Sequence, residues 1–397
     1  MVMFLSHPPD SGKTEDWYWT NVAGVPFLLR NLLNIQKAGG RELILSASPS
    51  AQAQLAKRIG QDARVELNLE WISDPKQILP HLEACETVLL LDGRVLFQPK
   101  DIQQSLSISG EQQDSTNFQT ALLEPENMVT LLEKLDGLLV QGTPFNETAE
   151  LFISPPGKTT VQIRLLQTPT DSTIRHLDDF AIQHKRLLNS CGLNNDSLMD
   201  RMITRLVSRQ LTRLFLGTSI TPNQITLLSL LFGLASGACF YSGSYRLGLA
   251  GAGLLVISAW IDCTDGEIAR LKFLESKLGK QLDIYSDNIV HVTIFFAIGM
   301  GATQATGQKL YLLFGGLAVL GTLISFTLLN TSIMDKKSAG AQNQVPESLQ
   351  EQIANRDFIY LILLMAIVGK LHWFIILAGA GSNLFASYAL YTKYKQH

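Results

Sequence analysis

The pattern of hydrophobic and polar positions changes at about residue 217. Before this point, short apolar, β-branched runs alternate with stretches of helical periodicity. Beyond it, long apolar runs follow one another with short polar connections. The pattern predicts an α/β soluble domain at 1–175 and a linker with an amphipathic juxtamembrane helix at 176–222. An all-α transmembrane domain with six helices is predicted at 223–397.

In the soluble domain, strands are predicted at four β-branched runs: Val2–Leu5, Glu42–Ala47, Val65–Trp71 and Thr87–Leu91. Helices are predicted where apolar residues recur with helical spacing: Pro26–Ala38, Ser50–Ile59 and Pro75–Cys85. Strands that alternate with helices favour βαβ units, so we expect a mostly parallel sheet.

Six apolar runs follow, most of them close to the roughly 20 residues that a bilayer core requires. They are Gln224–Tyr241, Leu247–Asp265, Leu282–Ala302, Leu310–Leu329, the shorter Phe358–Val368, and His372–Leu390. Basic residues are more frequent in the connections on one side, and the positive-inside bias places that side in the cytoplasm. Met1–Leu5 is too short for the apolar core of a signal peptide. We therefore expect an integral protein of the cytoplasmic (inner) membrane with both termini in the cytoplasm.

Within the linker, arginines recur every four residues among apolar positions: Arg201, Arg205, Arg209 and Arg213. This spacing predicts a basic amphipathic helix suited to an anionic membrane surface. A solvated helix of a soluble domain is the alternative, and the position immediately before a membrane span favours the membrane surface. Thr221-Pro222-Asn223 ends this helix, because proline cannot continue it.

Charge and cysteine content exclude some classes of function. A net charge of −3 argues against a strongly basic nucleic-acid-binding protein. The four cysteines are scattered without a CxxC pair, which gives no sign of zinc and suits a reducing cytoplasm.

The candidate chemistry lies in DCTDGEIARLKFLESKLGKQLDIYSD, from Asp262 to Asp287. Asp262 and Asp265 are three residues apart and share a helix face, while Asp283 and Asp287 are four apart on the next helix. If the two helices face each other, four carboxylates meet. A divalent cation is their natural partner, and oxygen ligands alone select Mg²⁺ or Mn²⁺ over Zn²⁺.

A solvated acidic loop is the alternative interpretation of this stretch. Asp283 and Asp287, however, lead directly into the apolar run NIVHVTIFFAIGMGA. A carboxylate at the centre of a membrane helix costs about 2.5–3.5 kcal/mol on insertion scales, so such a residue is a candidate functional group.

The same stretch matches D-x2-D-G-x2-A-R-x8-G-x3-D-x3-D at every fixed position. This is the signature of the CDP-alcohol phosphotransferases (CDP-alcohol phosphatidyltransferases), and the chain resembles that family. The resemblance implies a membrane enzyme that moves a substituted phosphoryl group from a CDP-alcohol, such as CDP-diacylglycerol, to an acceptor hydroxyl and releases CMP. Phospholipid or polyol-phosphodiester synthesis is the implied context.

The resemblance also implies a role for each aspartate. Asp262, Asp265 and Asp283 are expected to bind Mg²⁺ or Mn²⁺, with two ions in the site. Asp287 is either a further ligand or the general base, and the family assigns the base to its position.

The remaining motif positions are expected to bind the donor. Gly266 and Ala269 leave space for the cytidine, and Ser276 and Gly279 fit the family's pattern. Arg270 complements phosphate or forms a structural salt bridge.

The expected partners are the CDP-alcohol donor, an alcohol or polyol-phosphate acceptor, the lipid bilayer and a second copy of the chain in a homodimer; no nucleic acid is expected. Two other functions stay open. A membrane cation transporter would also carry intramembrane carboxylates, but deep in several spans rather than at one end. A nucleotide-sensing membrane protein without catalysis is the other, against which the complete motif argues.

The first domain resembles sugar-nucleotide nucleotidyltransferases in Ala23–Ser48 and in LLLDGRVLFQP, Leu89–Pro99. Fusions of this kind occur in the bifunctional inositol-phosphate cytidylyltransferase/di-inositol-phosphate phosphate synthase proteins, to which the chain is similar. SHPPDSGK stands where active members have a glycine-rich loop, and Arg94 stands at the metal-binding aspartate, with Asp92 two residues before it. We therefore expect a degenerate, inactive nucleotidyltransferase-like domain.

Overall fold

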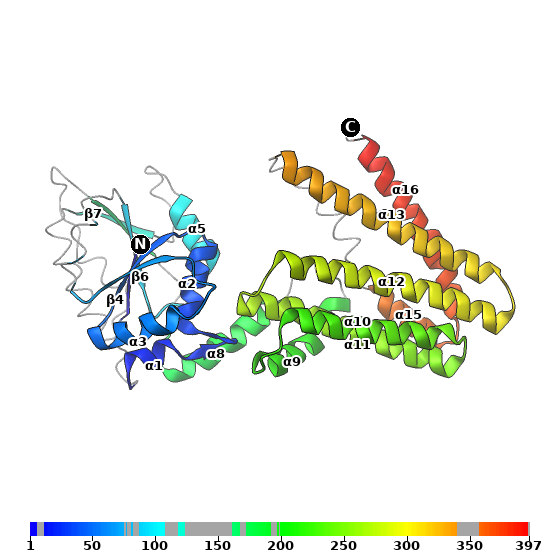
Figure 1. Cartoon of the computed structure of the whole chain (residues 1–397), viewed down its shortest axis with the longest axis horizontal. Helices are drawn as coiled ribbons and strands as arrows, with labels where there is room; N and C mark the ends of the chain where they lie inside the picture. The colour runs from blue at the N-terminus through cyan, green and yellow to red at the C-terminus, as the bar shows by residue number, and fades with distance from the viewer. Residues whose placement is uncertain are drawn as a thin grey trace. The chain divides into compact units, whose positions relative to one another are not determined.

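The computed structural model describes residues 1–5, 12–74, 77, 81, 87–107, 118–123, 161–166, 172–191, 197, 199–339 and 357–395 (Figure 1). The chain divides into two compact units, Met1–Leu187 and Leu188–His397. The first unit contains a sheet, and the second is helical.

The sheet of the first unit has six strands in the order β5-β4-β1-β6-β8-β7. Four of them were predicted: β1 (Val2–Phe4), β4 (Glu42–Ser46), β5 (Asn68–Ile72) and β6 (Thr87–Asp92). The sequence did not predict β7 (Phe118–Leu123) and β8 (Val161–Leu166). Neighbouring strands are parallel except β7 and β8, so the expectation of a mostly parallel sheet is confirmed.

The helices of this unit include the predicted α2 (Phe27–Lys37) and α3 (Pro49–Ile59). The others are α1 (Thr14–Tyr18), α5 (Pro99–Ser107) and α8 (Leu177–Asn189), and a short hairpin joins β2 (Asn21–Val22) to β3 (Val25–Pro26). The helix predicted at Pro75–Cys85 falls mostly outside the described residues. Leu28, Leu32 and Ile35 of α2 are buried in the core with Met3 and Leu45 of the strands.

The second unit begins with a π-helical turn, η4 (Asp200–Thr204), which continues into α9 (Arg205–Leu216). The helices that follow are α10 (Pro222–Tyr241), α11 (Tyr245–Lys272), α12 (Lys277–Thr306), α13 (Leu310–Ala339), α15 (Asp357–Ile367) and α16 (Leu371–Lys395). Among the described residues, four helices, α10 to α13, are long and apolar enough to cross a membrane. The chain is therefore a membrane protein, and the expected six spans are not confirmed; α15 has only 11 residues.

Polar side chains fix where the long helices begin. The hydroxyl of Thr221 accepts a hydrogen bond from the amide of Gln224, whose side chain accepts one from the amide of Thr221, and Pro222 occupies the first turn. This capping box satisfies amides that a helix start leaves unpaired. Ser244 caps α11 and Ser276 caps α12 in the simpler one-bond form. The caps thus fix the residue at which each of these helices begins.

Glycines allow α10 and α12 to pack closely. A Cβ at Gly233 would lie 2.5 Å from Cγ2 of Val290, and one at Gly301 would collide with the carbonyl oxygen of Phe240. Backbones approach this closely where small residues line the interface of membrane helices. Gly253 on α11, in contrast, has open space beside it.

Replacing Gly301 by alanine should therefore destabilise the helical unit, because the new methyl group overlaps backbone that cannot move without shifting the helices. Overpacking of this kind costs about 1–3 kcal/mol. We expect a lower thermal unfolding midpoint for Gly301→Ala than for the matched change Gly253→Ala, measured by tryptophan fluorescence in detergent. Equal midpoints for the two variants would contradict the close contact.

Candidate active site

Three carboxylates meet near the end of α11 and the start of α12. Asp262 and Asp265 of α11 and Asp283 of α12 each offer an oxygen, and these oxygens lie within 4.8 Å of one another. Asp262 and Asp265 are each only 6% exposed. Among the described residues Asp287 is outside this group. The structure thus brings together three of the four aspartates that the sequence singled out.

Hydroxyl groups of α10 hold the two aspartates of α11. Thr226 donates a hydrogen bond from Oγ1 to Oδ2 of Asp265, and Ser229 donates one from Oγ to Oδ1 of Asp262 at 3.3 Å. Ser258 in turn donates to the carbonyl of Ser229 at 2.7 Å. The sequence analysis missed Thr226 and Ser229. Their signal was a spacing of three residues, which places both on one face of α10.

Asp287 lies one helical turn beyond Asp283 and lines a small cavity that Asp262 also lines. Ser229, Ser286 and His291 form part of the same wall. The ring of His291 stands edge-on to that of Phe358, with the ring centroids 5.1 Å apart. Asp287 and Asp262 therefore line one small, partly polar cavity next to the three-carboxylate group.

Gly266, Ala269 and Arg270 follow the aspartates on α11. A Cβ at Gly266 would lie 3.2 Å from Nη1 of Arg270, so the guanidinium covers that glycine. Nη2 of Arg270 donates to the carbonyl oxygen of Cys191 at 3.3 Å. Among the described residues, no ion pair between Arg270 and a carboxylate accompanies this contact, so of the two roles considered for Arg270 the pairing with phosphate stays a prediction.

Ser276 and Gly279 have structural roles at the start of α12. Oγ of Ser276 accepts a hydrogen bond from the amide of Gly279 at 2.9 Å. A Cβ at Gly279 would lie 2.9 Å from Oδ1 of Asn223, at the start of α10. Ser276 therefore caps the start of α12, and Gly279 lets this start lie close to the start of α10.

Cys191, whose carbonyl accepts the hydrogen bond from Arg270, carries a thiol of low reactivity. Burial raises the pKa of its thiol to about 11, and the negative charge of Glu267 acts in the same direction. The thiol is thus protonated at neutral pH, and a thiolate nucleophile at this position is excluded.

The donor set suits a hard divalent cation. It consists of carboxylate oxygens, two of them on buried residues, and contains no histidine or cysteine. Like charges this close require neutralisation, and oxygen-only ligands favour Mg²⁺, Mn²⁺ or Ca²⁺. The residues present therefore fit the metal that the sequence pattern implied.

The comparison with known families identifies the region that contains this site. Residues 219–390 match the model of the CDP-alcohol phosphatidyltransferase family. Helices α10 to α12 and all four aspartates lie within this CDP-alcohol phosphatidyltransferase domain.

Curated relatives of the chain carry related names. The bifunctional IPC transferase and DIPP synthase of Aquifex aeolicus is 26% identical over 204 residues, 51% of this chain and 45% of the relative. The archaetidylinositol phosphate synthase of Pyrococcus horikoshii is 37% identical over 82 residues, 21% of this chain and 42% of the relative. The matched stretches thus span less than half the length of these relatives.

A crystal structure of Mycobacterium tuberculosis phosphatidylinositol phosphate synthase with CDP-DAG bound is also similar to part of the chain. It is 16% identical, and the match covers 48% of this chain and 92% of that one with a TM-score of 0.36. This likeness is too slight to place individual residues of the present chain.

In the first unit, Arg94 forms a buried ion pair with Asp92. Nε and Nη2 of Arg94 donate to Oδ1 and Oδ2 of Asp92 at 3.1 and 2.9 Å, and both residues are at most 5% exposed. Burial alone would lower the pKa of Arg94, but the hydrogen bonds and charge of Asp92 raise it above its usual range. The cation beside Asp92 is thus an arginine of the chain itself.

The two segments that carry the nucleotidyltransferase resemblance contact each other. Asn31 of α2 donates to the carbonyl of Val95 at 2.8 Å and accepts from the amide of Phe97, while Asn34 donates to the carbonyl of Phe97 at 2.8 Å. The asparagines of α2 therefore hold the chain that follows β6.

If the three carboxylates hold a divalent cation, Asp283→Asn should weaken its binding by more than about tenfold, because an amide keeps the shape but lacks the charge. Mn²⁺ binding to the purified chain, followed by electron paramagnetic resonance, provides the measurement. Glu275→Gln, the same change at an exposed carboxylate outside the group, should leave the affinity unaltered. Equal Mn²⁺ affinity in Asp283→Asn and the unmodified chain would rule out a role for Asp283 as ligand.

Proposed function

We propose that the CDP-alcohol phosphatidyltransferase domain transfers a substituted phosphoryl group from a CDP-alcohol to the hydroxyl of an acceptor. The single observation that carries this proposal is the meeting of Asp262, Asp265 and Asp283 within a region that matches the family. Because these carboxylates lie close together, they can bind a cation, and this cation can hold the charged diphosphate of the donor.

The reaction forms a bond between the acceptor oxygen and the phosphorus that bears the donor's alcohol. The bond from this phosphorus to the CMP oxygen breaks, so CMP leaves with the electron pair. The proton of the acceptor hydroxyl goes to a base, for which we propose Asp287. Its position on the wall of the cavity that Asp262 also lines supports this role, because a hydroxyl bound there would lie close to a carboxylate that can accept its proton.

The proposed cofactor is Mg²⁺ or Mn²⁺, with two ions held by Asp262, Asp265 and Asp283 and with Asp287 within reach. When bound, the ions neutralise charge on the diphosphate and on the leaving CMP. The hydroxyls of Thr226 and Ser229 orient the carboxylates of α11 for this purpose. Gly266 and Ala269 leave room for the cytidine, and Arg270, Ser276 and Gly279 border the donor.

The names of the relatives suggest the substrates. We propose a lipid CDP-alcohol, such as CDP-diacylglycerol, as donor and a polyol phosphate of the inositol phosphate class as acceptor. The site then faces the cytoplasm of an inner membrane with both termini on the same side, and two copies of the chain form a homodimer.

A cation transporter is the second candidate, and the position of the carboxylates argues against it. The three grouped carboxylates lie together at adjoining ends of α11 and α12 instead of at successive depths along several spans.

For the first unit we propose an inactive nucleotidyltransferase-like domain that serves as a scaffold or a binding module. The pairing of Arg94 with Asp92 supports this, because both oxygens of Asp92 already accept hydrogen bonds from a cation.

The proposed function predicts release of CMP when the purified chain is incubated with Mg²⁺, radiolabelled CDP-diacylglycerol and inositol phosphate, glycerol phosphate or another polyol phosphate. In Asp287→Asn, turnover should fall by about 10²–10⁴-fold, because the acceptor hydroxyl loses its base. Binding of the CDP-alcohol and of Mn²⁺ should remain close to that of the unmodified chain, and added Mg²⁺ should not restore the rate.

Asp283→Asn is the matched control, since added Mg²⁺ should recover part of its activity. Rescue of Asp287→Asn by Mg²⁺ would make Asp287 a ligand and move the base elsewhere. A failure of the unmodified chain to release CMP with every pair of CDP-alcohol and acceptor would overturn the proposed function.

The first unit should not form a CDP-alcohol. With CTP, Mg²⁺ and any sugar or polyol phosphate, we expect no pyrophosphate release, because Arg94 occupies the carboxylate that a metal ion would need. Pyrophosphate release that disappears in a chain lacking residues 1–170 would show that this unit is an active nucleotidyltransferase.

A further inference from the structure

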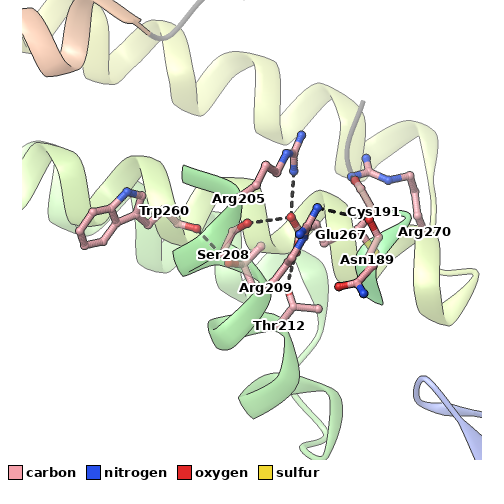
Figure 2. Close-up of polar contacts among 10 residues, drawn as sticks. Asn189, Cys191, Arg205, Ser208, Arg209, Thr212, Trp260, Glu267 and Arg270 are labelled. Carbon is pink, nitrogen blue, oxygen red and sulfur yellow. Dashed lines mark hydrogen bonds and ion pairs between the residues drawn. The ribbon is translucent and has the colours of Figure 1, made fainter. Parts of the chain in front are cut away.

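A fully buried carboxylate lies on α11 between the motif residues and is not part of the carboxylate group described above. Glu267 is 0% exposed, and its hydrogen bonds to α9 come from three side chains on one face of that helix. Oε1 accepts from Nη1 of Arg205 at 2.8 Å and from Oγ of Ser208 at 2.7 Å, while Oε2 accepts from Oγ1 of Thr212 at 2.6 Å (Figure 2). Arg205, Ser208 and Thr212 are themselves buried. A buried charge is tolerated only with such pairing.

The position of Glu267 on its helix makes this contact relevant to the candidate active site. Successive residues of an α-helix are about 100° apart, so Glu267 points about 200° away from Asp265. One face of this turn therefore holds Asp265 against Thr226 of α10, and the opposite face holds Glu267 against α9. This turn of α11 thus makes hydrogen bonds on two opposite faces. These bonds fix the rotation of α11 about its axis and its position along that axis.

The other face of α9 shows why this contact determines the register of the two helices. Leu206 and Leu214 are 62% and 67% exposed, whereas the side chains that contact Glu267 are polar and buried. Beside them, Leu211 and Phe215 pack against an apolar cluster that includes Ile261 and Ile268 of α11. An apolar interface tolerates small sliding, because hydrophobic contact is non-directional. Hydrogen bonds to a buried carboxylate do not tolerate it, since they require distances of about 2.7–3.0 Å and leave a buried charge unpaired when they break.

Further polar contacts join the same parts of the unit. Oγ1 of Thr204 and the indole nitrogen of Trp260 lie 2.8 and 3.2 Å from the hydroxyl of Tyr360 on α15, so η4, α11 and α15 share one hydrogen-bonding centre. Near the other end of α9, Lys272 donates to the carbonyl of Thr218 at 3.0 Å. Along α11, Glu267 lies between Trp260 and Lys272, and its carboxylate is surrounded by side chains of α9.

We propose that Glu267 is a positioning residue, which through its ion pair with Arg205 and its bonds to Ser208 and Thr212 holds the turn of α11 that presents Asp262, Asp265 and Arg270. The proposal rests on the proposed function of these aspartates as metal ligands. Glu267 touches neither the donor nor the acceptor. It acts by keeping the α11 carboxylates in register with Asp283 of α12, so that all three oxygens reach one cation.

Glu267→Gln tests this proposal, because the amide keeps the size of the side chain and removes the charge that Arg205 requires. We expect Mn²⁺ binding to the full chain, followed by electron paramagnetic resonance, to weaken by about tenfold, as outer-shell changes typically do. In steady-state assays of CMP release, raised Mg²⁺ should recover much of the rate, since the ligands themselves remain. Mn²⁺ affinity within twofold of the unmodified chain would overturn the proposal.

Ser236→Ala provides the matched control for a general loosening of the helices. Oγ of Ser236 donates to the carbonyl of Gly251 at 2.7 Å, so this variant also removes a buried hydrogen bond to α11. The contact lies about 20 Å from Asp265 along the helix, given a rise of about 1.5 Å per residue. Ser236→Ala should lower the thermal unfolding midpoint without changing Mn²⁺ affinity. An equal loss of affinity in Ser236→Ala would also overturn the specific role of Glu267.

Two further variants keep the test informative if Glu267→Gln does not fold. Thr212→Ala removes one donor and should weaken Mn²⁺ binding in the same direction by a smaller factor, whereas an unchanged affinity would contradict the proposal. In Arg205→Gln/Glu267→Gln both charges are absent, and we expect Mn²⁺ to bind no more weakly than in the single variants; additive losses would show that the pair does not act as a unit. If the unmodified chain binds no Mn²⁺ through Asp283, the proposed function fails instead.

Discussion

The repulsion among three carboxylates is the constraint on which the helical unit depends. Asp262, Asp265 and Asp283 have oxygens within 4.8 Å of one another, and two of these side chains are buried. Without a cation, such an arrangement would favour protonation or separation of the helices. Contacts in the surrounding structure oppose both protonation of the carboxylates and separation of the helices. Hydroxyls from α10 hold two of the carboxylates, and glycines at Gly233 and Gly279 bring α10 and α12 close together.

The second feature is the polar side of α9. A helix in a soluble protein usually buries its apolar face, but α9 buries Arg205, Ser208 and Thr212 beside Leu211 and Phe215 and exposes Leu206 and Leu214. Exposed leucines are reasonable on a helix that precedes a membrane span, because lipid can cover them. The sequence analysis placed four arginines on a lipid-facing surface. Arg205 instead pairs with Glu267 inside the unit, because a buried carboxylate requires a cation more than the membrane surface does.

The first unit also contains a buried carboxylate, but there a side chain of the chain itself neutralises it. Asp92 stands at the end of β6, where a parallel sheet commonly presents ligand-binding groups. Its two oxygens are occupied by the guanidinium of Arg94, two residues further along the chain. A covalently attached cation thus neutralises this carboxylate, whereas the three-carboxylate group of the helical unit has the donor set of a site for a divalent cation.

The sequence by itself determined much of the local structure. Alternating apolar runs predicted the strands β1, β4, β5 and β6, and long apolar runs predicted the membrane helices, because burial in a sheet or a bilayer demands these periods. The spacing predicted that Asp262 and Asp265 share one helix face and that Asp283 lies on the next helix, where the two helices could bring them together. β7 and β8 escaped prediction because they pair across a long separation in sequence, and no short-range pattern records such a pairing.

Only the tertiary structure decided which groups meet between helices. The partners of Asp262 and Asp265 on α10, the cavity that Asp262 and Asp287 both line and the burial of Glu267 all depend on helix rotation and crossing. Periodicity reveals the face on which a residue lies, but not the neighbour that this face will meet. For that reason Glu267 could not be distinguished from an exposed glutamate in the sequence, although it lies two residues from Asp265.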